Sequence, residues 1–422
     1  MFYQRKQGRS NIPNANANIM LLATVITEVI LASLVLIPLV LYRLKTQRWN
    51  RLTLDYPTNP HQDKLTILLP IWNESLVIEK KLSNLNRAYP FETSLLVIDS
   101  ASDDDSVTKV QDWLSRNEGI FSTTQLIAMP ERLGKTSAVK QALDSLTEQN
   151  YQGLVLMTDA DALIDDGSII RLHGWFADSS IGAVGSSARR KTSLSGEMQY
   201  RELFEQLRQG ESKIDSTPFL EGSCMMWRHG SFSLDKLNTA SNADDAQISA
   251  LIRFAGLRTI FDSQAKFTDF APSTIDGQRR QKIRRAQGLQ TMLMTVAKQN
   301  KLVKRGKYSM IFSYQRYLHL TAPLLLFLAG FSAIIRWTYV SVSGIPVGQE
   351  ALFHAGLGFL ELIILVAWLT NRNGIKLPLV YTIGTVVTGF EYLLISRIRI
   401  LLGRKSNRWD QHTDTRMLMS GN

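Results

Sequence analysis

The chain has 422 residues, a formal net charge of +11 and a single cysteine, Cys224. This length accommodates one sizeable catalytic domain together with a few membrane spans. A single cysteine excludes an intrachain disulfide and fits a reducing compartment. The basic balance suits nucleic acid, anionic lipid or a phosphate-bearing substrate, so the position of the charge decides among these partners.

The N-terminal region begins with an Asn-rich stretch and continues into a long apolar run. Residues 1–18 are predicted to be a disordered lead-in, and residues 19–42 contain Glu28 as their only charge. As a helix, this run is long enough to span a hydrocarbon core of about 30 Å. It is too long for the core of a signal peptide and lacks a small-residue cleavage pattern. We therefore predict a retained transmembrane anchor over residues 19–42.

Residues 43–310 mix short apolar runs with amphipathic stretches, and we expect them to form one soluble domain. The predicted strands are residues 65–71, 94–98, 125–129 and 153–157, and the predicted helices are residues 75–88, 107–114 and 136–146. Continuously apolar strands that alternate with helices predict an α/β fold with an open, mostly parallel sheet. Ligands of such sheets bind beyond the carboxyl ends of the strands.

Three of the predicted strands end in acidic residues. Glu74 follows the first strand, Asp99 follows the second, and Asp159 and Asp161 follow the fourth. Gathered at one edge, these carboxylates would need a cation. Asp159 and Asp161 can both reach one divalent ion, and a bound diphosphate can supply further ligands. Taken alone, Asp-x-Asp is usually a surface turn, so its position after an apolar strand carries this interpretation. We favour a nucleotide contact for Asp99.

Two further segments admit competing interpretations. Asp104 and Asp105 precede a helix, where carboxylates cap the helix and oppose its dipole, and we favour capping for both. Residues 132–136 end in Gly-Lys-Thr like a P-loop, but that pattern requires a glycine where Met129 stands. We reject the P-loop. Lys135 is then either a phosphate ligand at a helix start or a surface lysine.

The pair Asp244 and Asp245 opens an apolar-periodic segment, residues 246–254. Adjacent carboxylates at the start of a helix can be a helix cap. One of them can instead be a general base that takes a proton from an attacking hydroxyl. The spacing alone does not separate these two roles.

Positive charge is concentrated before the C-terminal apolar region. Residues 277–307 contain ten Lys or Arg and no acid. Basic residues beside a membrane span favour the cytoplasmic side and anionic head groups. Nucleic acid is the weaker interpretation, because no basic motif with interleaved aromatic residues is present.

The region 311–402 is predicted to hold transmembrane or interfacial helices, with candidate spans at residues 317–340, 351–369 and roughly 375–395. Three crossings would put the C-terminal tail, residues 403–422, outside, although its basic start prefers the inside. We therefore predict an interfacial helix around residues 391–402.

Three carboxylates lie within the apolar stretches of the membrane part, and they are Glu28, Glu361 and Glu391. Such residues are either functional or paired with a neighbouring helix, for instance with Arg336. The sequence leaves both interpretations open.

Six segments, taken in order, resemble the large inverting glycosyltransferase family 2, which includes cellulose, chitin and hyaluronan synthases. The resemblance covers about residues 64–290, with a similar membrane arrangement at both ends. The matching segments are residues 70–74, 97–104, 134–138, 158–161, 242–249 and 281–285. Each match is weak by itself, and the order of all six is what makes the resemblance specific.

The resemblance implies a GT-A fold, which is a Rossmann-like α/β fold with a mostly parallel sheet, here flanked by transmembrane helices. It implies an inverting single displacement in which Asp245 deprotonates the acceptor hydroxyl. Asp159 and Asp161 would hold Mg²⁺ or Mn²⁺ on the diphosphate. The implied donor-binding residues are Pro70, Asn73, Glu74, Asp99, Lys135, Gln281, Arg284 and Arg285.

Three departures from the family pattern limit what the resemblance implies. Ser100 stands where the family often has a second Asp, which weakens the inference about nucleotide preference. Arg285 stands where the family has a Trp near the acceptor sugar, so a processive polymerase is not implied. Residues 221–228 occupy the place of an acceptor-loop segment, and we expect their Met and Trp side chains to be core rather than acceptor contacts.

The sequence therefore predicts an integral, multi-pass protein of the cell membrane whose catalytic domain is cytoplasmic. The expected donor is a nucleotide-diphosphate sugar, with UDP as the family default, and the expected acceptor is a lipid or a growing glycan. Two alternatives stay open. They are a membrane-anchored sugar-nucleotide-binding or scaffold protein with a degenerate site, and a membrane phosphotransferase.

Overall fold

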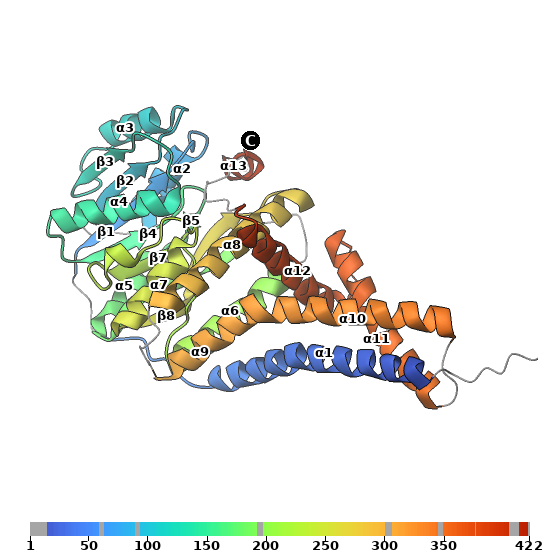
Figure 1. Cartoon of the computed structure of the whole chain (residues 1–422). Helices are drawn as coiled ribbons and strands as arrows, with labels where there is room; N and C mark the ends of the chain where they lie inside the picture. Colours follow the sequence, from blue (N-terminus) through green and yellow to red (C-terminus); the bar gives the residue numbers. More distant parts are fainter. Residues whose placement is uncertain are drawn as a thin grey trace, which may run out of the picture.

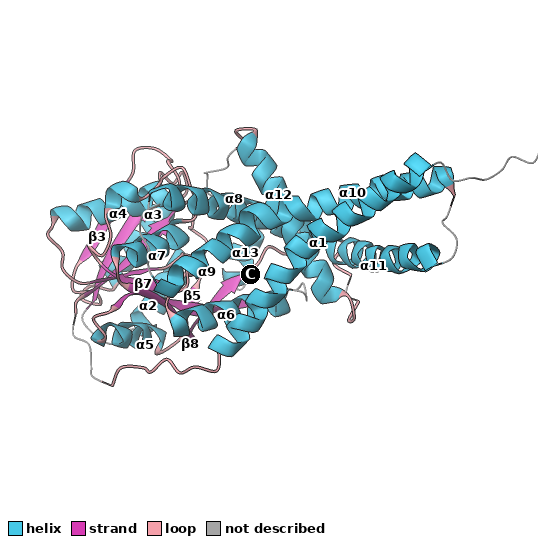
Figure 2. Cartoon of the chain, turned by 60° about the horizontal axis from the view of Figure 1, so that its bottom comes forward, coloured by secondary structure: helices cyan, strands magenta, loops and turns pink. Residues whose placement is uncertain are grey.

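The structure is a computed structural model that describes residues 15–58, 63–88, 93–191, 197–299, 306–344, 349–375, 377–404 and 413–420. An α/β domain lies at one end of the molecule, and long helices extend from it (Figure 1). In Figure 2, the strands of the described residues lie within the α/β domain. Most of the predicted lead-in, up to residue 14, lies outside the described residues.

The described strands form one eight-stranded sheet in the order β3-β2-β1-β4-β7-β6-β8-β5. Their bounds are β1 Leu65–Ile71, β2 Thr93–Asp99, β3 Thr124–Ala128, β4 Leu154–Met157, β5 Leu163–Ile164, β6 Ile181–Lys191, β7 Met225–Arg228 and β8 Arg258–Phe270. Strands β3, β2, β1 and β4 are parallel, whereas β7 is antiparallel to both of its neighbours. The prediction of a mostly parallel α/β sheet is confirmed.

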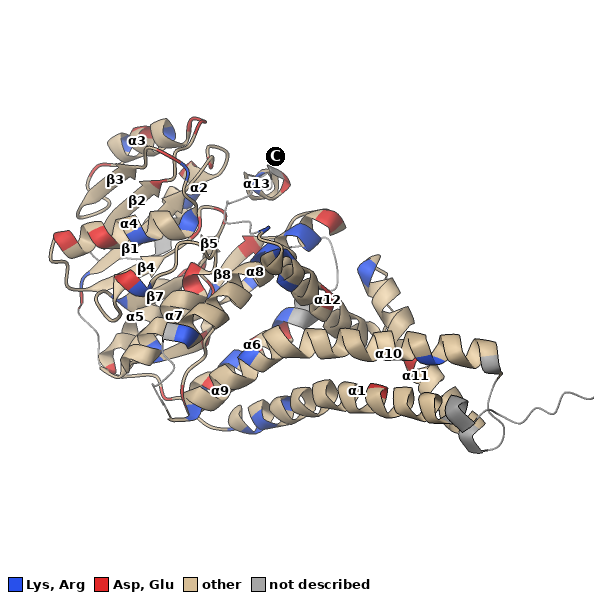
Figure 3. Cartoon of the chain, viewed as in Figure 1, with Lys and Arg blue, Asp and Glu red and all other residues tan. Residues whose placement is uncertain are grey.

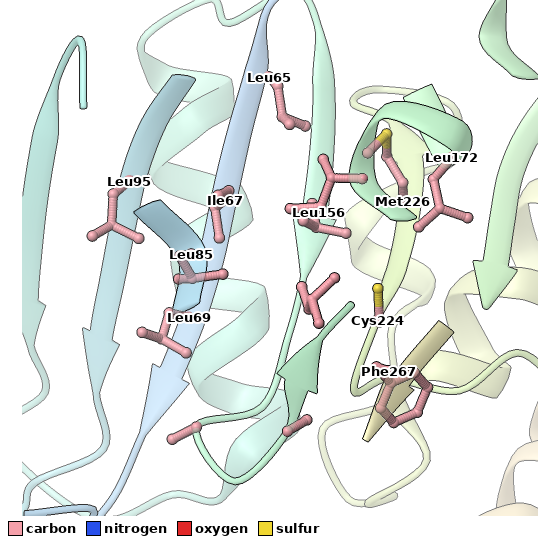
Figure 4. Packing of buried hydrophobic residues seen from close by; sticks show 14 of the residues in the cluster. Leu65, Ile67, Leu69, Leu85, Leu95, Leu156, Leu172, Cys224, Met226 and Phe267 are labelled. Carbon is pink, nitrogen blue, oxygen red and sulfur yellow. The ribbon is translucent and has the colours of Figure 1, made fainter. Parts of the chain in front are cut away.

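Strands β1, β2 and β4 are mostly apolar because helices cover both faces of the sheet. In β1, Leu65, Ile67 and Leu69 belong to one buried cluster, whereas Leu68 belongs to the cluster on the opposite face. Figure 4 shows the first three beside Leu95 of β2. Side chains alternate between the faces of a strand, so a strand buried on both faces shows no polar alternation.

The helices of the catalytic domain are α2 Ile78–Ala88, α3 Ser106–Arg116, α4 Lys135–Glu148, α5 Ser168–Gly174, α6 Glu197–Ile214, α7 Asp244–Ala255 and α8 Ile275–Gln299. Residues of α2, α3 and α5 contribute to the first buried cluster, and residues of α4, α7 and α8 contribute to the second. Short 3₁₀ turns follow α5 and β7.

Parallel pairing brings the acidic strand ends to one edge of the sheet. Ile71 at the end of β1 pairs with Asp99 at the end of β2, and Leu68 of β1 pairs with Met157 at the end of β4. The loops after β1, β2 and β4 therefore leave the sheet at the same edge, where ligands of open α/β sheets bind.

The helices outside the sheet domain are α1 Ala15–Trp49, α9 Gly306–Arg316, α10 Ala322–Ser343, α11 Gln349–Arg372, α12 Tyr381–Leu401 and α13 Thr413–Ser420, and a π-helical turn, η3 Tyr317–Thr321, joins α9 to α10. Among the described residues, Ile19–Trp49, Gly306–Val342 and Ala351–Arg372 are long and apolar enough to span a membrane. Figure 3 shows few charged residues along α1, α10 and α11. The predicted span at 375–395 falls largely in α12, which is not among these three candidates.

The carboxylates of the apolar stretches are paired with cations of neighbouring helices. Buried Arg336 forms ion pairs with Glu28, at 2.9 Å, and with Glu361. Glu391 pairs with Arg279 of α8 and with Arg372 of α11. The structure thus shows the pairing that was one of the two interpretations of these residues.

Candidate active site

A largely buried ammonium group joins two of the acidic segments. Lys135 is the first residue of α4, and its Nζ lies 2.6 Å from Asp159 Oδ1 and 3.4 Å from Asp244 Oδ2. Burial favours the neutral amine, but the carboxylates of Asp159 and Asp244 outweigh it and raise the pKa of Lys135. Lys135 is therefore not a surface lysine. Asp159, Asp161, Asp244 and Asp245 are called the acidic cluster below.

Asp245 is held by backbone donors at the start of α7. Its Oδ2 accepts a hydrogen bond from the backbone N–H of Gly222 at 3.0 Å, and its Oδ1 accepts one from the N–H of Ala246 at 2.7 Å. Burial and the neighbouring carboxylate of Asp244 raise the pKa of Asp245 to about 6. This position suits a general base, because such a carboxylate is ionised at neutral pH and still accepts a proton readily.

A buried lysine that the sequence analysis did not single out forms hydrogen bonds to the turn that carries Asp159 and Asp161. Lys81 of α2 is fully buried, and its Nζ donates to Thr158 Oγ1 at 2.7 Å and to the carbonyl of Ala162 at 2.5 Å. Ser223 Oγ also donates to Asp159 Oδ2 at 2.8 Å. In the sequence, Lys81 falls on the apolar side of α2. A lysine at such a position indicates a buried side chain that needs a polar partner.

The C-terminal helix α13 reaches back to the strand ends. The Arg416 guanidinium binds both oxygens of Glu74, at 2.6 and 3.0 Å, and lies 3.1 Å from Asp161 Oδ2. Burial disfavours the charged form of this arginine, but Asp161 and Glu74 outweigh that effect and raise its pKa. The sequence showed no sign of this contact, since Arg416 lies in the segment predicted to be a tail.

The loops after β1 and β2 bind each other through polar side chains. The backbone N–H of Asp103 donates to Asn73 Oδ1 at 2.9 Å, and the N–H of Asn73 donates to Ser102 Oγ at 2.9 Å. Within the second loop, the N–H of Ser102 donates to Asp99 Oδ2 at 3.0 Å. Asn73 has a positive φ of 54°, so it sits in a conformation that asparagine tolerates better than most residues. Pro70 lies within β1 itself. These residues form the loop framework beside the acidic cluster.

The capping prediction is correct for one of two aspartates. Asp104 accepts the N–H of Ser106, the first residue of α3, at 2.9 Å. Asp105 occupies the N-cap position but makes no side-chain capping bond.

One cavity of about 750 Å³ connects the acidic cluster with α8. Of the predicted site residues, Lys135, Asp159, Asp161, Asp245, Gln281, Arg284 and Arg285 line it. Pro70, Asn73, Glu74 and Asp99 do not line this cavity, although Arg416 links Glu74 to it. The volume lies within the range of small-molecule sites.

Some residues of the segment 221–228 line the cavity, and others belong to the hydrophobic core. Met225, Met226 and Trp227 form most of β7 and are fully buried, as expected for core residues. Glu221 instead lines the cavity, where Arg208 binds it at 2.7 Å. Thr136 of the Gly-Lys-Thr segment donates to the carbonyl of Ser241, which is a structural contact and consistent with the rejected P-loop.

The carboxylates at the strand ends determine whether a metal fits this site. Among the described residues, no group of three or more His, Cys, Asp or Glu side chains converges to hold an ion. Mg²⁺ is commonly held by one or two protein carboxylates together with substrate phosphates. Asp159 and Asp161 match that donor set, so the residues fit an ion that arrives with a diphosphate. In the structure, Lys135 and Arg416 neutralise these two carboxylates.

Comparison with known sequences identifies the domain. Residues 66–234 match the glycosyl transferase family 2 model. Poly-beta-1,6-N-acetyl-D-glucosamine synthase of Staphylococcus aureus (strain COL) is 24% identical over 237 residues, which cover 54% of this chain and 55% of the relative. The synthase of Staphylococcus epidermidis is 22% identical over 259 residues, or 60% of each chain. The match thus spans little more than half the length of these curated relatives.

Comparison with solved structures confirms the fold. The mannosyltransferase PcManGT from Pyrobaculum calidifontis, solved with GDP-Man and Mn²⁺, superposes with a TM-score of 0.69 at 24% identity. The superposition covers 90% of this chain and 99% of that structure. The family match and the fold together define the class of protein as a glycosyltransferase with the GT-A fold. More particularly, the chain carries a glycosyltransferase family 2 domain.

Proposed function

We propose that this protein is a membrane glycosyltransferase that moves a sugar, with inversion, from a nucleotide-diphosphate sugar to a hydroxyl of a lipid or glycan. The convergence of Asp159 and Asp244 on one ammonium group, Lys135 Nζ, carries this proposal. Lys135 thereby links Asp159, in the segment proposed to hold the leaving group, with Asp244, in the segment proposed to hold the base. These two segments lie far apart in the sequence.

The proposed reaction is a single displacement. Asp245 takes the proton of the acceptor hydroxyl while its oxygen attacks the anomeric carbon from the face opposite the diphosphate. The bond from the anomeric carbon to the diphosphate oxygen breaks, and the nucleoside diphosphate leaves with the electron pair. Holding the acceptor and the anomeric carbon in line accounts for much of the expected acceleration.

The remaining site residues bind and neutralise the donor in this proposal. Lys135, Arg284 and Arg285 offset phosphate charge, and Gln281 lies on the same helix as the two arginines. The loop framework of Pro70, Asn73, Glu74 and Asp99 contacts the nucleoside. Mg²⁺ or Mn²⁺ held by Asp159 and Asp161 would stabilise the charge of the departing diphosphate as a Lewis acid.

We place the catalytic domain on the cytoplasmic side of the membrane. Basic residues of α8 lie next to the membrane helices, and α12 ends in a basic turn with Arg397 and Arg399 (Figure 3). Clusters of Lys and Arg beside spans favour the cytoplasmic side.

Purified full-length protein with Mn²⁺ and a panel of nucleotide sugars that includes UDP-GlcNAc and GDP-Man tests the proposal. We expect release of a nucleoside diphosphate from at least one donor. Asp245→Asn should abolish turnover and keep nucleotide binding, whereas Asp105→Asn, an exposed acid outside the cavity, should behave as the wild type. Release of pyrophosphate, or full turnover by Asp245→Asn, would contradict the proposal.

A further inference from the structure

The cavity that contains the acidic cluster has a second wall made of helices that lie outside the sheet domain. Leu39 of α1, Leu318 of η3, and Phe390 and Leu393 of α12 line the same cavity. These four residues belong to one hydrophobic cluster, which lies between the helices outside the sheet domain. A site for a purely water-soluble sugar acceptor has no need of such a wall.

The apolar wall continues directly into the candidate spans. Leu39 lies within Ile19–Trp49, and Leu318 lies within Gly306–Val342. Figure 1 shows α12 between α8 and the long helices α1 and α10. The cavity thus connects the proposed catalytic base on α7 with side chains of two candidate membrane spans.

A charged section separates the two ends of the cavity. Glu221, next to the glycine that binds Asp245, pairs with Arg208 at 2.7 Å and with Arg201 at 3.6 Å. Leu207, the neighbour of Arg208 on α6, packs against the hydrophobic cluster of the membrane helices. Contacts therefore lead from Asp245 through the paired charges to the apolar wall, beside which polar side chains such as His319 and Thr388 also line the cavity.

We propose that the acceptor is a membrane amphiphile, a lipid-linked compound whose polar head presents a hydroxyl to Asp245. Its apolar chain lies against Leu39, Leu318 and Phe390, and its head lies against the paired charges of Glu221 and Arg208. This inference rests on the proposed function and names its acceptor class. The product is a glycolipid that stays in the membrane, and the other product is the nucleoside diphosphate.

The order of the lining favours this acceptor over a growing water-soluble polymer. An amphiphile gains from burying its chain against apolar side chains, by about fourfold in affinity for each methylene group. A polysaccharide chain has no comparable apolar segment, and hydroxyls placed against Leu39 and Phe390 would lose their hydrogen bonds to water.

The test uses the full-length protein in nanodiscs that contain lipids extracted from the membranes of cells that express it. A nucleotide sugar labelled in its sugar is added with Mn²⁺, and the label is followed into a chloroform–methanol extract and into the aqueous phase. We expect the label in the organic extract. Leu39→Trp, which fills the apolar end, should lower this incorporation about tenfold.

Two comparisons make the result decisive. Leu36→Trp places the same ring on the exposed face of α1 and should match the wild type, while Leu393→Trp on α12 should repeat the loss. Thermal unfolding and gel filtration verify that each variant is folded. Label in an aqueous polymer or in free sugar, or equal incorporation by Leu39→Trp, would overturn the inference and leave the proposed function intact. Absence of any nucleoside diphosphate release would instead overturn the proposed function.

Discussion

Replacing Arg416 by glutamine should tighten Mn²⁺ binding to the nucleotide-free protein. In the structure, Arg416 lies 3.1 Å from Asp161 and binds both oxygens of Glu74. A metal that binds Asp161 must therefore displace this guanidinium. Hydrogen bonds to charged groups are worth about 1.5–3 kcal/mol, and the partial exposure of Asp161 favours the lower value. The expected gain in Mn²⁺ affinity is about tenfold.

The substitution should leave α13 docked, because other contacts hold the helix. Lys80 Nζ donates to the carbonyl of Met419 at 2.7 Å, and Ser273 Oγ donates to Asp414 at 2.7 Å. Glu74 would lose its cation. Burial already raises the pKa of Glu74 to about 7 against the opposing effect of the arginine, so this carboxyl can take up a proton near neutral pH.

Titration of Mn²⁺, followed by the electron paramagnetic resonance signal of the free ion, measures the affinity directly. Arg116→Gln is the matched control, because Arg116 forms an exposed ion pair with Glu79 at 2.6 Å. The control should bind Mn²⁺ as the wild type does. Unchanged or weaker Mn²⁺ binding by Arg416→Gln would refute the idea that this arginine competes with the metal for Asp161.

Three further predictions concern the base and its surroundings. A base with a pKa of about 6 must be deprotonated to act, so kcat/KM should fall about tenfold per pH unit below pH 6 and level off above it; a flat profile between pH 5 and 7 would exclude Asp245. Gly222→Ala should lower turnover roughly ten- to a hundredfold with nucleotide binding retained, because its Cβ would lie 3.2 Å from the Cβ of Asp245; normal turnover would show that this carboxylate need not keep its position. Lys81→Met should lower the melting temperature, since two buried oxygens lose their donor at a cost of about 1–3 kcal/mol each; wild-type stability in thermal unfolding would show that the turn does not need this anchor.

The parallel half of the sheet could be predicted because local sequence determines it. Residues 65–71 are apolar except for Thr66, and the strand has those bounds. The second half of the sheet was not predicted. Strands β6 and β8 include charged residues such as Arg190 and Asp269, which pair with each other between the strands. Such pairing joins residues that are distant in the sequence, and no local pattern indicates it.

The candidate site shows the same division. Asp159 could be proposed because it follows a recognisable strand, and Lys135 could be proposed because it begins a predicted helix. The contacts of Arg416 depend on where the C-terminal helix packs, which no periodicity in residues 413–420 indicates. The structure also separates the predicted donor residues. Asn73 and Asp99 form hydrogen bonds in the loops after β1 and β2, whereas Gln281 and Arg284 line the cavity. Roles within the donor site stay predictions.

The position of the leaving group is tested most directly by a crystal structure of the protein with Mn²⁺ and the nucleoside diphosphate that it releases. We expect an anomalous Mn²⁺ peak within bonding distance of Asp159 or Asp161 and of both phosphates, with Asp245 facing the emptied sugar position. A diphosphate bound away from these aspartates, with Lys135 and Arg416 still paired to them, would contradict the proposed chemistry.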